Sequence, residues 1–147
     1  GVEHRIELVR EKDGVKYYND SIASSPTRTI AALKAFEKKV ILIAGGYDKH
    51  IPFDPLMPYL TEKVKVLYLC GDTADKIESC LRSYEGYKGT PEIIRVKDVA
   101  EAVALAGKTA KSGDIVALSP ACASFDMYDN FEQRGEHFKN YVKSKKV

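Results

Sequence analysis

Hydrophobic and polar positions along this chain alternate between the two-residue period of strands and the longer period of helices. Residues 4–12 and 15–19 alternate polar and apolar side chains on either side of Asp13-Gly14. An Asp-Gly pair between two such runs favours a two-residue turn. We therefore predict a β-hairpin over residues 4–19.

Beyond the hairpin, short apolar runs alternate with amphipathic segments. Strands are predicted at residues 40–44, 64–70, 92–96 and 114–118, and helices at 27–36, 54–60, 73–84, 98–111 and 131–142. Strands that alternate with helices form parallel sheets with helices on both faces. The pattern predicts an α/β fold: a Rossmann-like three-layer sandwich with a mostly parallel sheet and the N-terminal β-hairpin at one edge. We expect residues 1–147 to form a single domain.

Composition excludes several classes of function. The 147 residues are 44% hydrophobic, and 23 basic side chains nearly balance 21 acidic ones, so net charge gives no reason to expect nucleic acid binding. No apolar run approaches the roughly 20 residues of a membrane helix, so we expect no membrane partner. There is no signal peptide and no initiator Met, and we expect a cytoplasmic domain that is part of a longer protein.

The three cysteines show no metal-binding or disulfide spacing. An odd number of cysteines without a C-x-x-C pair indicates reduced thiols. Cys70 and Cys80 fall on apolar positions and are predicted to be core residues. Cys122 lies in a polar loop, but a catalytic thiol needs a histidine partner that the sequence does not supply, so a nucleophilic role is disfavoured.

Ligands of such sheets bind outside the carboxyl ends of the strands. Three polar loops follow predicted strands, at residues 19–25, 45–49 and 119–130. In the first, Asp20 and Ser21 could hold ribose hydroxyls or a phosphate-bound metal. A turn before a helix that begins at Ser25-Pro26 explains them equally well.

The second loop, residues 45–49, begins with Gly45-Gly46, which would let the backbone approach a ligand, and Lys49 could add a positive charge. Taken alone, this loop is better explained as a plain turn with an exposed lysine. It lacks the G-x-G-x-x-G pattern, which disfavours a dinucleotide site. Residues 107–109 resemble the end of a phosphate loop but lie at the end of a predicted helix and lack the first glycine.

The third loop contains the strongest candidate, Ser124. Its hydroxyl and the backbone N–H groups of Phe125 and Phe131 could bind a carboxylate, because a strand-to-helix turn leaves N–H groups free at the positive end of the helix dipole. We expect Arg134 to tie this loop to the following helix.

Other charged residues are predicted to be peripheral. Asp129 and Glu132 would repel an anion and should face away from it. His50 and His137 have no partners at metal-ligand spacing and are predicted to lie on the surface, so no metal site is expected. Arg5 could pair with a phosphate, although an exposed strand charge is the simpler interpretation.

Four segments together resemble the C-terminal domain of the Mur ligase family: Gly1–Arg5, Asn19–Ser21, Gly45–Lys49 and Ser119–Gly135. They occur in the family's order across the whole chain, and the last is long and specific. The resemblance implies a Rossmann-like domain that follows a UDP-binding N-terminal domain and a central ATPase domain. It also implies an ATP-dependent ligase that joins D-glutamate to UDP-N-acetylmuramoyl-L-alanine through an acyl phosphate, in peptidoglycan precursor synthesis.

The same resemblance assigns roles to individual residues. Ser24 and Lys49 match residues that hold the α-carboxylate of D-glutamate. Ser124, with the backbone at Phe125 and Phe131, matches the γ-carboxylate site. No catalytic residue is implied in this domain.

The implied ATP contacts are Arg5, Asp20 and Ser21, which would close over the phosphates and ribose. ATP and Mg²⁺ would be bound mainly by the central domain. The chain departs from the family at Ile22, where Lys is frequent, and at Ser24, where Thr is frequent.

Two other interpretations stay open on the sequence. The chain could be a Rossmann-like module that binds a nucleotide or small acid without chemistry of its own. It could also belong to a sibling Mur ligase or a polyglutamate-type ligase that adds another amino acid.

Overall fold

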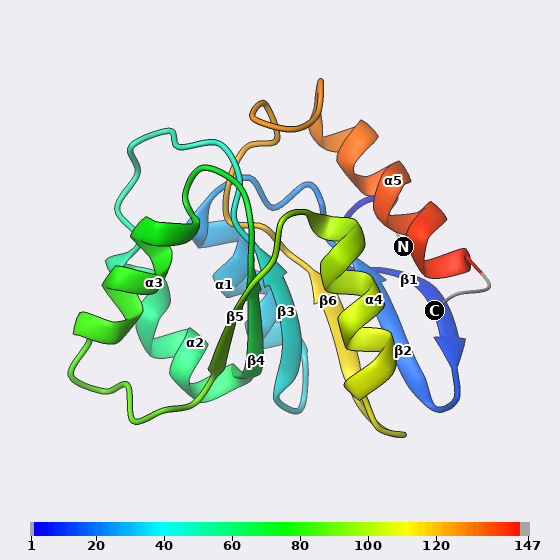
Figure 1. Cartoon of the computed structure of the whole chain (residues 1–147), viewed down its shortest axis with the longest axis horizontal. Coiled ribbons are helices and arrows are strands. Elements are labelled where there is room, and N and C mark those ends of the chain that lie inside the picture. Colours follow the sequence, from blue (N-terminus) through cyan, green and yellow to red (C-terminus); the bar gives the residue numbers. More distant parts are fainter. Residues whose placement is uncertain (1, 145–147) are drawn as a thin grey trace.

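Six strands form one mixed sheet in the computed structural model, which describes residues 2–144 (Figure 1). The strands are β1 (Glu7–Lys12), β2 (Val15–Asn19), β3 (Val40–Ala44), β4 (Val64–Leu69), β5 (Glu92–Arg95) and β6 (Ile115–Leu118), and their order is β1-β2-β6-β3-β4-β5. Only β1 and β2 pair antiparallel; the other neighbouring strands of the sheet are parallel. The predicted mostly parallel sheet with a hairpin at one edge is confirmed.

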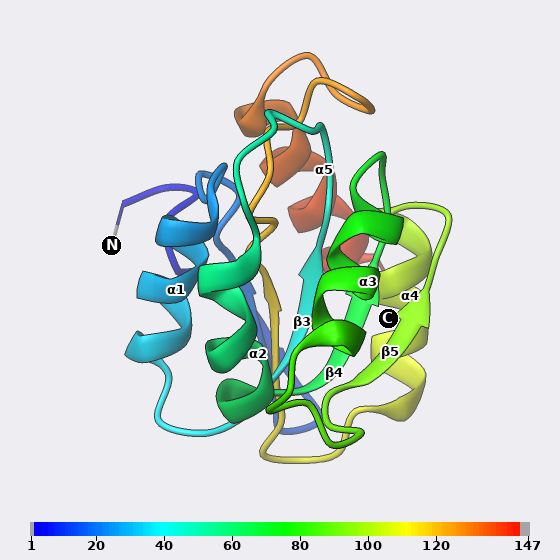
Figure 2. The same ribbon diagram turned by 90° about the vertical axis from the view of Figure 1, so that its left-hand side faces the viewer.

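Helices cover both faces of this sheet. They are α1 (Pro26–Ala35), the 3₁₀ turn η1 (Asp54–Leu56), α2 (Met57–Lys63), α3 (Ala74–Ser83), α4 (Val99–Thr109) and α5 (Phe131–Lys143). The helices α1, α2 and α3 pack on one face, and α4 and α5 pack on the other (Figures 1 and 2). The three-layer sandwich is therefore also confirmed.

The central strand β3 shows why a continuous apolar run is needed. Leu42 and Ala44 point into the core beneath α1, α2 and α3, whereas Ile41 and Ile43 point into the core beneath α4 and α5. Successive side chains of a strand alternate between faces, so a strand covered on both sides must be apolar throughout.

The predicted helix over residues 54–60 is divided between η1 and α2. Ser25 does occupy the N-cap of α1, with Pro26 as the first helical residue, but its side chain makes no capping hydrogen bond. Asn130 caps α5 through its side chain, because Asn130 Oδ1 accepts from Gln133 N at 2.7 Å. This cap fixes where the last loop ends.

The strand order places three loops side by side, because β6 lies between β2 and β3. Asp20 N donates to Leu118 O at 2.8 Å, Ser119 N donates to Ile43 O at 3.2 Å, and Gly45 N donates to Pro120 O at 2.9 Å. The loops that follow β2, β6 and β3 are thus hydrogen-bonded across one edge of the sheet. Within the described part of the chain, the helices are too short or too polar to span a bilayer.

Candidate functional site

The buried side chain of Arg134 links two of the three loops. It is 2% exposed and donates from Nη2 to Ser21 O at 2.7 Å, from Nε to Ser21 Oγ at 3.0 Å and from Nη1 to Cys122 O at 2.8 Å. Its Nη2 also lies 3.5 Å from Ser24 Oγ. Arg134 therefore ties its loop to the helix, as predicted, and ties the 19–25 loop to the same point.

Arg134 forms no ion pair with any carboxylate in residues 2–144. Burial lowers the pKa of its guanidinium to about 10, partly offset by the nearby Cys122, Asp126 and Tyr128. A guanidinium at that pKa is still charged at neutral pH. A buried positive charge therefore lies beneath the loops of the site, and it is held there by hydrogen bonds to two backbone carbonyls and a hydroxyl.

Ser124 is 3% exposed, and its backbone carbonyl accepts from Met127 N at 3.1 Å and Tyr128 N at 2.8 Å. Its hydroxyl has no hydrogen-bond partner among the described residues. Every fully buried side-chain oxygen and nitrogen in that part of the chain has a hydrogen-bond partner. Because the Ser124 hydroxyl has none, it is not fully buried, and solvent reaches it. The hydroxyl is available to a ligand.

The two phenylalanines beside Ser124 have different environments. Phe125 is 64% exposed and stacks edge-on against Tyr47, with ring centroids 6.0 Å apart. Phe131 is the first residue of α5, and its carbonyl accepts from Ser21 Oγ at 2.7 Å. Since the Asn130 side chain caps Gln133 N, the N–H of Phe131 is not used by the cap. Glu132 and Asp129 are both exposed, and neither forms an ion pair within residues 2–144.

Lys49 lies in the loop after β3 and is exposed. It makes no ion pair or hydrogen bond with residues 2–144, whereas the adjacent Asp48 pairs with Lys76 at 3.2 Å. The His50 N–H and Lys76 together keep the pKa of Asp48 below its usual value. Asp48 therefore pairs with Lys76 and not with Lys49, so the Lys49 ammonium group is available to bind an anion.

Gly45 and Gly46 serve packing here. A Cβ at Gly45 would lie 1.9 Å from Cys70 O, and one at Gly46 would lie 2.5 Å from Ala123 O. Both residues have positive φ, 107° and 159°. The glycines let this loop pass close to the end of β4 and to the 119–130 loop, so the close approach predicted for a ligand is made to the protein's own backbone.

The predicted ATP contacts are divided between two environments. Ser21 is buried, and its hydroxyl is used by Phe131 O and Arg134 Nε. Asp20 is 3% exposed and accepts from Ser119 Oγ at 2.7 Å and Ile6 N at 3.0 Å. Burial raises the pKa of its carboxyl. Arg5 is exposed and lines the same hollow as Asp20, whereas Ser21 does not line it.

The cysteines are unsuited to nucleophilic chemistry. Burial raises the pKa of Cys122 to about 11 and that of Cys70 to about 12. Cys122 Sγ lies 3.2 Å from Thr73 Oγ1, and no histidine contacts it in the described structure. Cys80 is only partly buried and packs at the margin of the core.

The two histidines predicted to lie on the surface differ. His50 is exposed. His137 is also at the surface but half-buried, because its ring packs edge-on between Tyr128 at 5.2 Å and Tyr141 at 6.2 Å.

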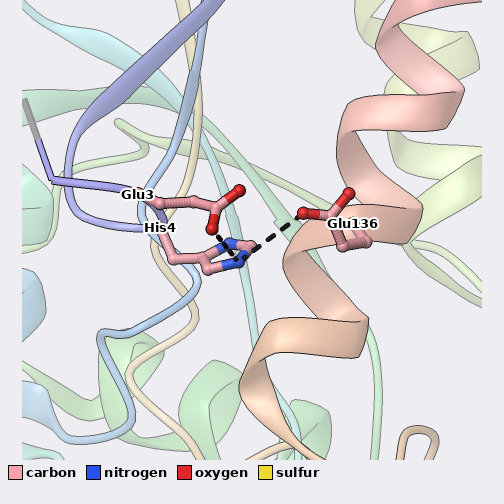
Figure 3. A group of neighbouring side chains, drawn as sticks. All are labelled: Glu3, His4 and Glu136. Carbon is pink, nitrogen blue, oxygen red and sulfur yellow. Dashed lines mark ion pairs between the residues drawn. The ribbon is translucent and has the colours of Figure 1, made fainter.

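The sequence analysis missed a cluster around His4, shown in Figure 3. The buried His4 Nε2 lies 3.8 Å from both Glu3 and Glu136, on either side of the contact between the N-terminal segment and α5. Lys139 Nζ pairs with Glu3 at 2.9 Å, Glu7 at 3.2 Å and Glu136 at 3.3 Å. Glu3, His4 and Glu136 have the grouping of a metal site.

The hydrogen bonds argue for an ion-pair network at this cluster. Asn19 Oδ1 accepts from Ser21 N, so Asn19 Nδ2 faces His4 Nδ1 at 2.8 Å and must donate to it. His4 then carries its proton on Nε2, directed at the carboxylates, and Nε2 has no lone pair for a metal. The Lys139 ammonium supplies the positive charge that balances the carboxylates of Glu3, Glu7 and Glu136. The only sequence signal for this contact is a glycine, Gly135, inside a helix.

Comparison with known proteins gives a consistent result. Residues 4–122 match the family model described as "Mur ligase, glutamate ligase domain". Proteins named UDP-N-acetylmuramoylalanine–D-glutamate ligase are similar to the chain: one from Clostridium botulinum (strain Hall) is 59% identical over 145 residues, and one from Acetivibrio thermocellus is 60% identical over 147. Each match covers 98% of this chain and 32% of the relative, so the chain spans about a third of these relatives' length.

Solved structures share the fold. The murein peptide ligase mpl from Psychrobacter arcticus has a TM-score of 0.64 at 15% identity, covering 97% of this chain and 30% of that one. A domain of a ligase from Haemophilus ducreyi has a TM-score of 0.60 at 18% identity, covering 94% of this chain and 99% of that one. A bifunctional folylpolyglutamate synthase/dihydrofolate synthase from Yersinia pestis has a TM-score of 0.61 at 17% identity, covering 82% and 29% respectively.

Proposed function

The chain belongs to the Mur ligase family and carries its glutamate ligase domain, and on this premise we propose that it is the amino-acid-binding domain of the ligase that joins D-glutamate to UDP-N-acetylmuramoyl-L-alanine. The names of its relatives favour D-glutamate over the amino acids of sibling ligases. The observation that carries the proposal is a pair of groups on neighbouring loops of one sheet edge, the Ser124 hydroxyl and the Lys49 ammonium, neither of which has a partner within residues 2–144.

We propose that residues 1–147 are a single domain of a cytoplasmic enzyme with three domains. The share of each relative that the chain covers leaves room for a UDP-binding domain and an ATPase domain. In this arrangement ATP and Mg²⁺ are held mainly by the ATPase domain.

D-Glutamate presents two carboxylates, and the site offers two groups of donors. Lys49 and Ser24 would hold the α-carboxylate, and Ser124 with the N–H groups of Phe125 and Phe131 would hold the γ-carboxylate. Charge-assisted hydrogen bonds to carboxylates are short and strong, which suits a small, charged substrate. Arg134 joins the loops that carry Ser24 and Ser124, because it binds Ser21 O and Cys122 O at once.

Holding both carboxylates leaves the amine of D-glutamate directed away from the sheet edge. In the proposed reaction that amine attacks an acyl phosphate of UDP-N-acetylmuramoyl-L-alanine, the new C–N bond forms, and phosphate leaves. The residues of this chain bind and orient the nucleophile. Orientation alone lowers a bimolecular barrier substantially, so the domain contributes to rate without a catalytic side chain of its own.

Steady-state kinetics of the full-length ligase test the site. Lys49→Ala and Ser124→Ala should each raise the KM for D-glutamate by roughly 10- to 100-fold, because a hydrogen bond to a charged group contributes about 1.5–3 kcal/mol. The KM for ATP should change by less than about 3-fold. Lys108→Ala, an exposed lysine on α4, serves as the matched control and should leave both constants unchanged.

An unchanged KM for D-glutamate in both variants would show that the site is assigned to the wrong residues. The 147-residue chain alone should form no amide from the three substrates. Ligase turnover by the chain alone would contradict the proposed division of labour between domains.

A further inference from the structure

The loop that follows β4 carries no predicted ligand-binding residue, yet it lies at the same edge of the sheet as the candidate site (Figure 1). The strand β4 is parallel to its neighbour β3, so their carboxyl ends lie side by side. This loop leads into α3 at Thr73, which is 0% exposed. Thr73 is therefore screened from a substrate, and its hydroxyl serves the protein's own loops.

The Thr73 hydroxyl contacts both of the loops that carry Lys49 and Ser124. Its Oγ1 accepts from Gly46 N at 3.0 Å and lies 3.2 Å from Cys122 Sγ. A hydroxyl has one donor and two acceptor positions, so it can bind both groups at once. Gly46 precedes Lys49 by three residues, and Cys122 precedes Ser124 by two. One buried side chain thus lies close in sequence and in space to both proposed carboxylate donors.

The N–H of Gly46 depends on this hydroxyl. Its neighbours are held by the 119–130 loop directly, because Gly45 N donates to Pro120 O and Tyr47 N donates to Ala123 O, both at 2.9 Å. The buried Gly46 N–H between them has Thr73 Oγ1 as its acceptor. Leaving a buried N–H without an acceptor is costly, so without the hydroxyl the loop is expected to shift.

The side chain of Thr73 supports this loop and not its own helix. Thr73 is the N-cap residue of α3, a position where a threonine side chain commonly accepts from a backbone N–H two or three residues later. Asp98 and Asn130 make such bonds at the start of α4 and α5. Thr73 makes no capping bond, and its hydroxyl accepts from Gly46 N instead.

We propose that Thr73 is a positioning residue of the D-glutamate site, and that its hydroxyl fixes the loop of Lys49 relative to the loop of Ser124. This inference rests on the proposed function. Two carboxylates held by separate loops need a fixed separation between those loops, because a misplacement of about 1 Å can cost about 100-fold in rate. The hydrogen bonds of Arg134 join the 19–25 and 119–130 loops, and Thr73 connects the remaining loop to them.

Kinetics of the full-length ligase test the proposal. Thr73→Val keeps the shape of the side chain but removes the acceptor of Gly46 N–H, so it should raise the KM for D-glutamate about 10-fold. Thr73→Ser keeps the hydroxyl and should stay within about 2-fold of the parent enzyme, and the KM for ATP should change by less than about 2-fold in both variants. If Thr73→Val does not fold, Thr73→Ala leaves space for a water molecule beside Gly46 and should still raise the KM for D-glutamate by about 3-fold or more.

The matched control is Val103→Ala, which removes buried apolar atoms beneath α4 and should destabilise the fold without changing the site loops. It should leave the KM for D-glutamate unchanged. An equal rise in Val103→Ala would assign the effect to lost stability, and an equal rise in Thr73→Ser would exclude a role of the hydroxyl. Either result, or an unchanged KM in Thr73→Val and Thr73→Ala, would overturn the proposal.

Hydrogen–deuterium exchange of the full-length ligase separates this inference from the proposed function. Peptides that span the two loops should exchange at least about 10-fold faster in Thr73→Val than in the parent, and at the parent rate in Thr73→Ser. If Lys49→Ala and Ser124→Ala leave the KM for D-glutamate unchanged, the proposed site fails, and faster exchange in both loops still supports Thr73 as the residue that positions them. If those two variants raise the KM but Thr73→Val changes neither the exchange nor the KM, only this inference fails.

Discussion

Replacing Gly135 with alanine should destabilise the fold, although helix propensity alone predicts the opposite. Gly135 lies inside α5, where alanine is favoured over glycine by about 1 kcal/mol. A Cβ at this position would, however, lie 2.1 Å from His4 Nδ1, 2.6 Å from His4 Cε1 and 3.1 Å from Asn19 Nδ2. The His4 ring packs directly on the helix backbone, so the methyl group has no space.

The size of the effect depends on which groups must move. If the His4 ring is displaced, Asn19 Nδ2 loses its buried 2.8 Å partner, which costs about 1–3 kcal/mol. Overpacking of the contact costs about a further 1–3 kcal/mol. After subtracting the helix gain of about 1 kcal/mol, Gly135→Ala should lower the free energy of unfolding by about 1–5 kcal/mol.

Urea unfolding followed by circular dichroism measures this difference, and an unchanged m-value would show that only stability has changed. The control is Gly107→Ala in α4, an exposed helical glycine, which should gain up to about 1 kcal/mol. In a His4→Ala background the penalty of Gly135→Ala should largely disappear, because the clash is gone. If Gly135→Ala stabilises the chain as Gly107→Ala does, the packing of His4 on α5 is wrong.

Three further predictions concern the groups around the site. Arg134→Met should lower the free energy of unfolding by about 2–4 kcal/mol in the same urea assay, because Ser21 O and Cys122 O each lose a buried donor; a loss below about 1 kcal/mol would contradict the bridging role. Iodoacetamide at pH ~8 should modify Cys80 at least about 10-fold faster than Cys70 or Cys122 by mass spectrometry, since burial raises the pKa of Cys122 to about 11 and that of Cys70 to about 12; faster labelling of Cys122 would contradict its burial. In the folded state, burial raises the pKa of Glu7, but hydrogen bonds from His4 N, Asn19 and Lys139 outweigh burial, so the pKa lies below its ordinary value of 4.5. Glu7 should therefore stabilise the fold above pH 4.5 and lose that contribution as the pH falls through its lowered pKa. The free energy of unfolding, measured across this pH range, should therefore fall less steeply with decreasing pH in Glu7→Gln than in the parent chain. Equal slopes would refute the stabilising role of the Glu7 carboxylate.

The sequence predicted the features that depend on neighbouring residues. Short apolar runs at residues 40–44 and 114–118 predicted the strands β3 and β6, and Asp13-Gly14 marked the hairpin. The tie made by Arg134 was also predictable, because the arginine follows its loop by only a few residues. Each of these inferences needed information from one stretch of chain.

The features that were missed depend on residues far apart in the sequence. In the sequence, Gly135 only lowers the helix propensity of α5. The structure shows that a glycine is needed there because the His4 ring packs on the helix backbone, and no local pattern predicts that contact. Lys139 resembles part of a solvated basic tail, yet its ammonium is surrounded by Glu3, Glu7 and Glu136. The partial burial of His137 has the same origin, because the Tyr128 ring that packs on it comes from the loop before α5.

The strand order itself constrains how D-glutamate would be held on the proposed assignment. Neighbouring strands lie about 4.8 Å apart, so the loops that contain Ser24 and Lys49, separated by β6, start about 10 Å from each other. An α-carboxylate shared by these two side chains must lie above the end of β6, and only a long, unpaired side chain such as Lys49 can reach it from β3. Ser124 follows β6 itself, so the γ-carboxylate falls on the same middle loop. The middle loop must then be held in place. Arg134 holds it by donating to Cys122 O at 2.8 Å, and its two bonds to Ser21 join the 19–25 loop to the same side chain.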